Sequence, residues 1–146
     1  MLRKKIRWFI RGEKGDGGAN LLGAVFILYI VFLVWAAGMD MYTQNIIRGN
    51  LKNVANETLQ MMKVENGADS GTRQKFNELL VDYGIDPSEV TFIATPKLVQ
   101  RGGKVQITAI MQYERKSMLL LGAPNVTVPI EVHASGLVHR YIRSGG

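Results

Sequence analysis

The chain has 146 residues, a formal net charge of +6 and no cysteine, and its mean hydropathy is close to zero at +0.03. A pI near 9.7 would ordinarily suggest a nucleic-acid partner. Most of the positive excess, however, lies in a short segment ahead of one apolar stretch, so we expect no nucleic acid to bind. The lack of cysteine excludes a disulfide framework within this chain.

A basic leader, residues 1–15, precedes the apolar stretch. Ahead of that stretch, Glu13 and Asp16 stand against six basic residues, Arg3, Lys4, Lys5, Arg7, Arg11 and Lys14, and the next basic residue after it is Arg48. Lys and Arg concentrate on the cytoplasmic side of a membrane helix. The sequence therefore predicts a cytoplasmic N-terminus and an extracytoplasmic C-terminal head. The segment 8–10 is either an interfacial helix or only part of the orienting leader.

The stretch from Gly17 to Met39 has 23 residues and no charge. At about 1.5 Å per helical residue, its apolar part from Leu21 to Met39 spans roughly 28 Å, close to the thickness of a bilayer's hydrocarbon core. It is longer than the apolar region of a conventional cleaved signal. We therefore expect a single-pass membrane helix over residues 16–39, in contact with the lipid bilayer. The segment also contains three small residues, Ala19, Gly23 and Ala24, which would let a second helix pack closely against it.

Residues 40–66 are more polar but keep a helical pattern. Apolar or small residues recur there every three or four positions: Ile47, Leu51, Val54, Thr58, Leu59 and Met62. We expect an amphipathic extension of the membrane helix that ends at Asn66-Gly67. Its apolar stripe must be covered by the rest of the chain.

Residues 67–146 read as a small α+β head. A helix over 72–84 is expected to bury Phe76, Leu79, Leu80 and Tyr83, with Gly84 as its C-terminal cap. Strands are expected at 90–95, 105–114, 126–132 and 135–143, with a short arm at 97–100, a hairpin turn at 101–104 and a loop at 117–124. Pro129 is tolerable only on an edge strand or at a bulge. A head of about 80 residues is close to the lower limit for an independent core, so we expect its antiparallel sheet to pack on the striped helix.

No catalytic, cofactor-binding or metal-binding set stands out. His133 and His139 lie in or beside late strands without clustered carboxylates or cysteines, which favours ordinary packing at a sheet surface or edge. The glycine-rich segment 12–18 follows no strand, so it lacks the context of a phosphate-binding loop. We therefore expect a protein that is not an enzyme and that has no cofactor.

The junction Lys14-Gly15-Asp16-Gly17-Gly18-Ala19-Asn20-Leu21-Leu22, followed by the long apolar helix, resembles type IV pilin-like proteins. Among these, it is most similar to the TadE-type pseudopilins of tight-adherence (Tad) pilus systems. The resemblance implies that a prepilin-type peptidase cuts after Gly15. It also places Asn20 where the family has a glutamate that neutralises a neighbouring subunit's terminal amine. Asn20 can hydrogen-bond an ammonium group but cannot cancel its charge.

Two functions are open at this point. The resemblance implies a structural subunit, a minor pilin or pseudopilin of a Tad-like pilus or a related secretion apparatus, whose partners are other pilin-like subunits and the pilus assembly machinery. The alternative is a permanently anchored surface or envelope protein whose head binds a partner.

Overall fold

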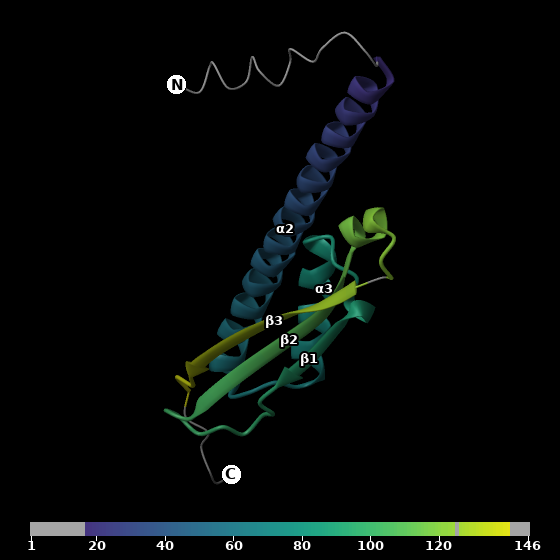
Figure 1. Cartoon of the computed structure of the whole chain (residues 1–146). Helices are drawn as coiled ribbons and strands as arrows, with labels where there is room; N and C mark the ends of the chain where they lie inside the picture. Colours follow the sequence, from purple (N-terminus) through teal and green to yellow (C-terminus); the bar gives the residue numbers. More distant parts are fainter. Residues whose placement is uncertain (1–16, 125, 141–146) are drawn as a thin grey trace, which may run out of the picture. The chain divides into compact units, whose positions relative to one another are not determined.

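A computed structural model of the chain describes residues 17–124 and 126–140, with side chains described from Asn20 onward. In chain order (Figure 1), its elements are α2 (Gly17–Glu65), α3 (Ser70–Asp82), the 3₁₀ helix η1 (Pro87–Glu89), β1 (Val90–Ala94), β2 (Lys104–Arg115), the 3₁₀ helix η2 (Lys116–Leu121) and β3 (Val126–Leu137). The fold is α+β, as predicted. It divides into two compact units, Met1–Gly38 and Met39–Gly146.

The described part of the first unit is the N-terminal portion of α2. All its large apolar side chains are exposed except Leu33, which is half-buried. Among the described residues, α2 is the one helix long and apolar enough to cross a membrane. Its apolar segment, Leu21–Met39, is therefore a candidate membrane span, as the sequence predicts.

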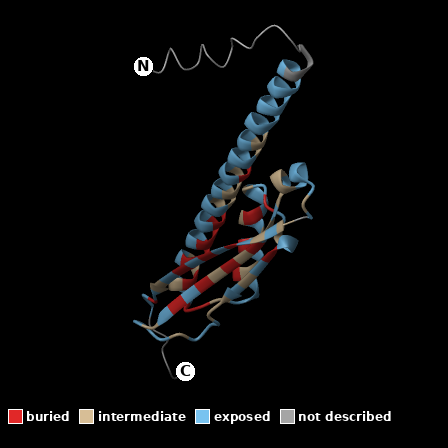
Figure 2. Cartoon of the chain, viewed as in Figure 1, coloured by how far each residue is buried: buried red, intermediate tan, exposed pale blue. Residues whose placement is uncertain are grey.

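In the second unit, α2 buries one face. Its buried stripe consists of five residues of the predicted pattern: Leu51, Val54, Thr58, Leu59 and Met62. Leu59 is 4% exposed, and the other four are 0% exposed. The hydroxyl of Thr58 donates to the carbonyl of Val54 at 2.9 Å, so this polar group is satisfied inside the core. Figure 2 shows this face of the helix in red, next to the buried face of the sheet. The predicted stripe is confirmed.

The sheet that covers the stripe is antiparallel, with the strand order β1-β2-β3. β2 lies in the centre of the sheet. It pairs with β1 over five residues, from Val90↔Met111 to Ala94↔Ile107, and with β3 along its whole length. Alternate residues of β2 face the core, and these are Val105, Ile107, Ala109 and Met111. They form one hydrophobic cluster with the buried stripe of α2 and with Phe76 and Leu80 of α3.

The predicted break between the last two strands is wrong. No strand break occurs near residue 134, because β3 continues to Leu137 and pairs Ser135 with Gln106 and Gly136 with Val105. The described residues 138–140 follow β3 and form no separate strand. The predicted short arm at 97–100 lies outside the three strands, and its Val99 N–H donates to the carbonyl of Asn66, directly after α2, at 3.0 Å. Pro129 lies on the edge strand β3, as expected.

The turns between the helices have clear local causes. α2 ends at Glu65 because Asn66 and Gly67 take positive φ angles of 65° and 125°. A side chain at Gly67 would place its Cβ 2.2 Å from the carbonyl oxygen of Pro96, so only glycine fits this close approach. At the end of α3, Gly84 has a φ of 73°, and Ile85 N–H reaches the Leu80 carbonyl at 2.8 Å, which completes a Schellman motif.

Candidate functional site

The N-terminal turns of α2 hold the residues that the sequence singles out for assembly: Ala19, Asn20, Gly23 and Ala24. Gly15 lies outside the described residues, and of Ala19 only the backbone is described, within α2. Asn20, Gly23 and Ala24 are exposed. No atom lies within 4 Å of the position of a Cβ at Gly23. Nothing in the described part of the chain therefore requires a small residue here, and the open space is available to a partner helix.

The exposed apolar surface of α2 is extensive. Over the apolar segment it includes Leu21, Leu22, Val25, Phe26, Ile27, Leu28, Tyr29, Ile30, Val31, Phe32, Val34, Trp35 and Met39, each at least 42% exposed. Soluble monomers rarely expose a contiguous apolar patch of this size. Such a surface needs either lipid or other apolar helices around it.

Asp40 is the first charged residue after the apolar segment, and it is buried, with 8% of its surface exposed. Its Oδ2 accepts the backbone N–H of Ser117 at 2.7 Å, and its Oδ1 accepts the Tyr113 hydroxyl at 3.1 Å. Desolvation raises the pKa of this carboxyl group, but the hydrogen bonds from Ser117 and Tyr113 outweigh it and leave the pKa below its usual value. Asp40 thereby joins the start of the second unit to the end of β2.

The same contact acts on Tyr113. Burial raises the pKa of its phenol, and the hydrogen bond to Asp40 and the negative charge of that carboxylate raise it further. The phenol therefore stays protonated and keeps donating to Asp40. Asp40 is not among the residues predicted to matter from the sequence, although its position directly after the uncharged run is a signal that points to it.

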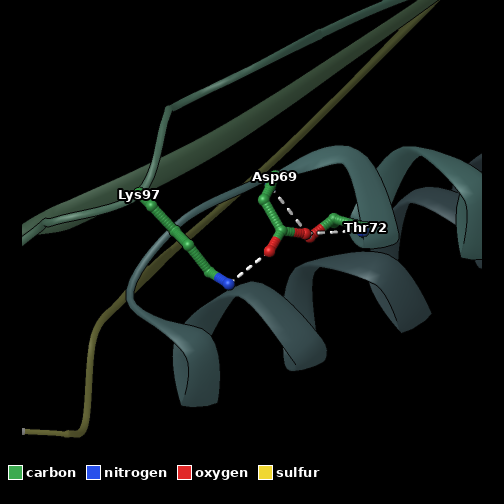
Figure 3. A network of polar contacts seen from close by, with 3 residues as sticks. All are labelled: Asp69, Thr72 and Lys97. Atoms are coloured by element: carbon green, nitrogen blue, oxygen red, sulfur yellow. Dashed lines mark hydrogen bonds and ion pairs between the residues drawn. The ribbon is translucent and has the colours of Figure 1, made fainter.

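A second polar network holds the start of α3 (Figure 3). Asp69 is the N-cap of α3, and its Oδ1 accepts the backbone N–H of Thr72 at 2.9 Å. Its Oδ2 accepts the Lys97 ammonium group. The pKa of Asp69 is lowered to about 2, mainly by the hydrogen bond from Lys97 and to a smaller extent by the bond from the Thr72 N–H. The same contact with Asp69 raises the pKa of Lys97. This network ties α3 to the segment between β1 and β2.

Asn66 provides a third link, at the end of α2. It is 5% exposed, and its side-chain amide donates to the carbonyls of Val99 and Arg140, both at 2.8 Å. One amide therefore joins α2, the β1–β2 connection and the segment after β3.

On the outer face of the sheet, a histidine, a threonine and a glutamate lie close together, in the combination of imidazole, hydroxyl and carboxylate groups that some hydrolases use. Nδ1 of His133 lies 3.0 Å from Oγ1 of Thr108, and its Nε2 lies 3.2 Å from Glu131. Thr108 and His133 border a hollow of about 170 Å³ that Gln106 and Ser135 also line. Thr108 lies in the central strand and is paired with β1 and with β3. The backbone N–H of Thr108 is therefore part of the sheet and is not aimed at the hollow as an oxyanion donor would be.

The histidines thus occupy the positions expected of sheet-surface residues. His133 lies on the exposed face of the edge strand β3, and His139 follows that strand and is also exposed. Over residues 17–124 and 126–140, no group of three or more His, Cys, Asp or Glu side chains is placed to hold a metal ion.

Comparison with known proteins gives one match. A family model described as a domain of unknown function (DUF4320) matches residues 24–143, which is most of the chain and includes the larger part of the apolar segment. No curated protein and no solved structure matches the chain.

Proposed function

We propose that this chain, which belongs to the DUF4320 family of domains of unknown function, is a pilin-like structural subunit that assembles through the apolar segment of α2. The observation that supports this role is the change of character along one helix. α2 is apolar and exposed over Leu21–Met39, and it then buries the stripe from Leu51 to Met62 under the sheet. A helix of this kind can be held in lipid before assembly and against other such helices after it. The proposed role is structural, with no catalysis and no nucleic acid.

The proposal includes an orientation. The six-to-two excess of basic residues ahead of the apolar segment favours a cytoplasmic N-terminus and an extracytoplasmic head. A reporter that is active only after export, fused behind Gly146, should be active. Activity of a cytoplasm-specific reporter at the same position would contradict this orientation.

Processing after Gly15 is the step that distinguishes a pilin from an anchor. The proposed partners are a prepilin-type peptidase, which removes the leader, and the pilus assembly machinery. Mass spectrometry of the protein from its native host should find Asp16 as the first residue. Gly15→Leu should leave the leader in place, because a bulky side chain before the cut blocks the peptidase. Gly12→Leu, the same change three residues earlier, is the control and should be processed normally.

Assembly through the apolar segment should depend on the small residues Ala19, Gly23 and Ala24. Gly23→Leu should permit processing but weaken cross-linking between subunits, since a larger side chain separates the helices. Gly38 is the matched control, because a Cβ there also meets no atom within 4 Å and it lies away from the three small residues. Equal cross-linking of wild type, Gly23→Leu and Gly38→Leu would exclude this face as the assembly surface.

Asn20 supports a second candidate function, the permanent membrane anchor. An asparagine at this position provides no negative charge to neutralise a terminal amine in an apolar filament core. If the protein is a pilin, Asn20→Glu should be tolerated or should improve assembly. If it is an anchor, wild-type protein from cells with an active prepilin peptidase should begin at Met1, and Asn20→Glu should impair insertion.

A further inference from the structure

The short helix η2, Lys116–Leu121, exposes apolar side chains that the core of the head does not use. Leu119 is 51% exposed and Leu121 is 59% exposed, whereas the core cluster contains no residue of η2. Figure 2 shows η2 in tan and pale blue, in contrast to the red residues of the neighbouring strands. Leu119 and Leu121, which we call the η2 leucines, are therefore free to contact a surface outside the head.

The position of η2 in the head indicates what its exposed leucines contact. The backbone N–H of Ser117, in the first turn of η2, donates to Asp40 at 2.7 Å. Asp40 follows Met39, the last residue of the apolar segment. A membrane span that ends at Met39 leaves the hydrocarbon core directly before Asp40, so η2 lies one hydrogen bond away from that exit point.

The neighbouring residues suit the boundary between water and lipid. Tyr42, two residues after Asp40, is 62% exposed, and tyrosine is enriched at the level of the headgroups. Arg115 and Lys116 lie a few residues ahead of the η2 leucines in the chain. Basic residues beside exposed leucines are typical of segments that lie in the interface of a membrane with anionic lipids.

We propose that η2 is a second membrane contact, in which the η2 leucines enter the interfacial layer of the leaflet where α2 leaves the bilayer and Lys116 faces lipid phosphates. Asp40 is the residue that positions η2 there. The inference depends on the membrane span of α2 but not on the proposed role in a pilus. The contact would fix the head at the membrane surface instead of leaving it free to turn about the end of the span.

The test uses the full chain in vesicles of phosphatidylethanolamine with a minor share of phosphatidylglycerol. Because the chain has no cysteine, Leu121→Cys carries a single label, an environment-sensitive fluorophore. Leu137→Cys is the matched control, since Leu137 is also an exposed leucine, 56% against 59%, but lies at the opposite end of the paired strands β2 and β3. The label at position 121 should shift its emission to shorter wavelength and lose most of its intensity when lipids carry a quencher near the carbonyl region. The label at 137 should do neither.

Asp40→Asn in the Leu121→Cys background tests the positioning role. An asparagine side chain keeps one acceptor oxygen but loses the second, so η2 should be released and the lipid quenching at 121 should fall. Protease protection of the span shows that insertion itself is unchanged. Equal quenching at 121 and 137 would overturn the proposal, and so would quenching at 121 that Asp40→Asn leaves intact. A third contrary outcome is a blue-shifted label at 121 that lipid quenchers do not affect and whose shift grows with the protein-to-lipid ratio. The last result would assign the η2 leucines to a second copy of the chain.

Discussion

The two halves of α2 are parts of one helix but place their apolar residues differently. Over Leu21–Met39, apolar side chains occur all around the helix and are exposed. Over Asp40–Glu65, they form one stripe, which the sheet covers. A helix that is apolar on every side suits lipid, whereas a striped helix suits the boundary between a protein core and water. The distribution of apolar residues around a helix, more than their number, therefore indicates its environment.

The strongest test of this difference removes the striped half. A fragment 39–146 keeps the stripe and the sheet, and it should unfold in one cooperative transition. A fragment 67–146 lacks the stripe, so Ile107, Ala109 and Val132 lose the helix that completes their cluster. It should be aggregated or molten, without a cooperative transition in calorimetry or near-ultraviolet circular dichroism. Equal stability of the two fragments would show that the sheet and α3 form a closed core without α2.

A single charge on the stripe should produce a smaller version of the same loss. Leu51 is 0% exposed, and Leu51→Asp in fragment 39–146 should lower the free energy of unfolding by about 2–4 kcal/mol, because it buries an unpaired carboxylate. Asn53→Asp, two residues away on the exposed face, is the control for the added charge and should change little. Urea denaturation measures both. Similar losses for the two variants would mean that the stripe is not the stabilising face.

The sequence was sufficient for the helical half of the fold and insufficient for the contacts that join distant segments. Burial on one face imposes a spacing of three and four residues, so Leu51 and Met62 could be placed in the core from the pattern alone. The bond from Ser117 to Asp40 joins residues 77 apart, and no local pattern encodes such a pair. Ser135-Gly136 suggests a turn by composition, but pairing with β2 extends β3 through it. Tertiary pairing overrides local preference at this point.

Asn66 tests the point where the striped half ends. Asn66→Asp keeps the shape of the side chain and its tolerance of a positive φ, but it replaces the amide donor with a carboxylate facing the carbonyls of Val99 and Arg140. We expect the free energy of unfolding of fragment 39–146 to fall by about 1–3 kcal/mol, since two buried hydrogen bonds are lost. Asn56→Asp, at an exposed position of α2, is the control. Urea denaturation that gives equal values for the two variants would contradict the linking role of Asn66.

The smallest expected effect is that of acid on the stability of the head, because the apolar segment carries no charged residue to titrate in this range. In the head, the pKa of Asp69 is lowered from 3.8 to about 2 by Lys97 and by the N–H of Thr72. A group with a depressed pKa in the folded state contributes stability above its unfolded pKa and loses it as the pH falls through the folded value. Part of the stability of the head should therefore disappear between about pH 4 and pH 2.

Asp69→Asn isolates this contribution, because asparagine remains a good N-cap for α3 while the ion pair with Lys97 is lost. The variant should be less stable than wild type at neutral pH, and the difference between the two should shrink as the pH falls towards the pKa of about 2. Asp82→Asn, at the exposed end of the same helix, controls for the loss of one negative charge. Asp40 and Asp86 also have lowered pKa values, so some acid sensitivity should persist in Asp69→Asn. A difference that stays constant from neutral pH down to about pH 2 would show that the ionised form of Asp69 contributes nothing to stability.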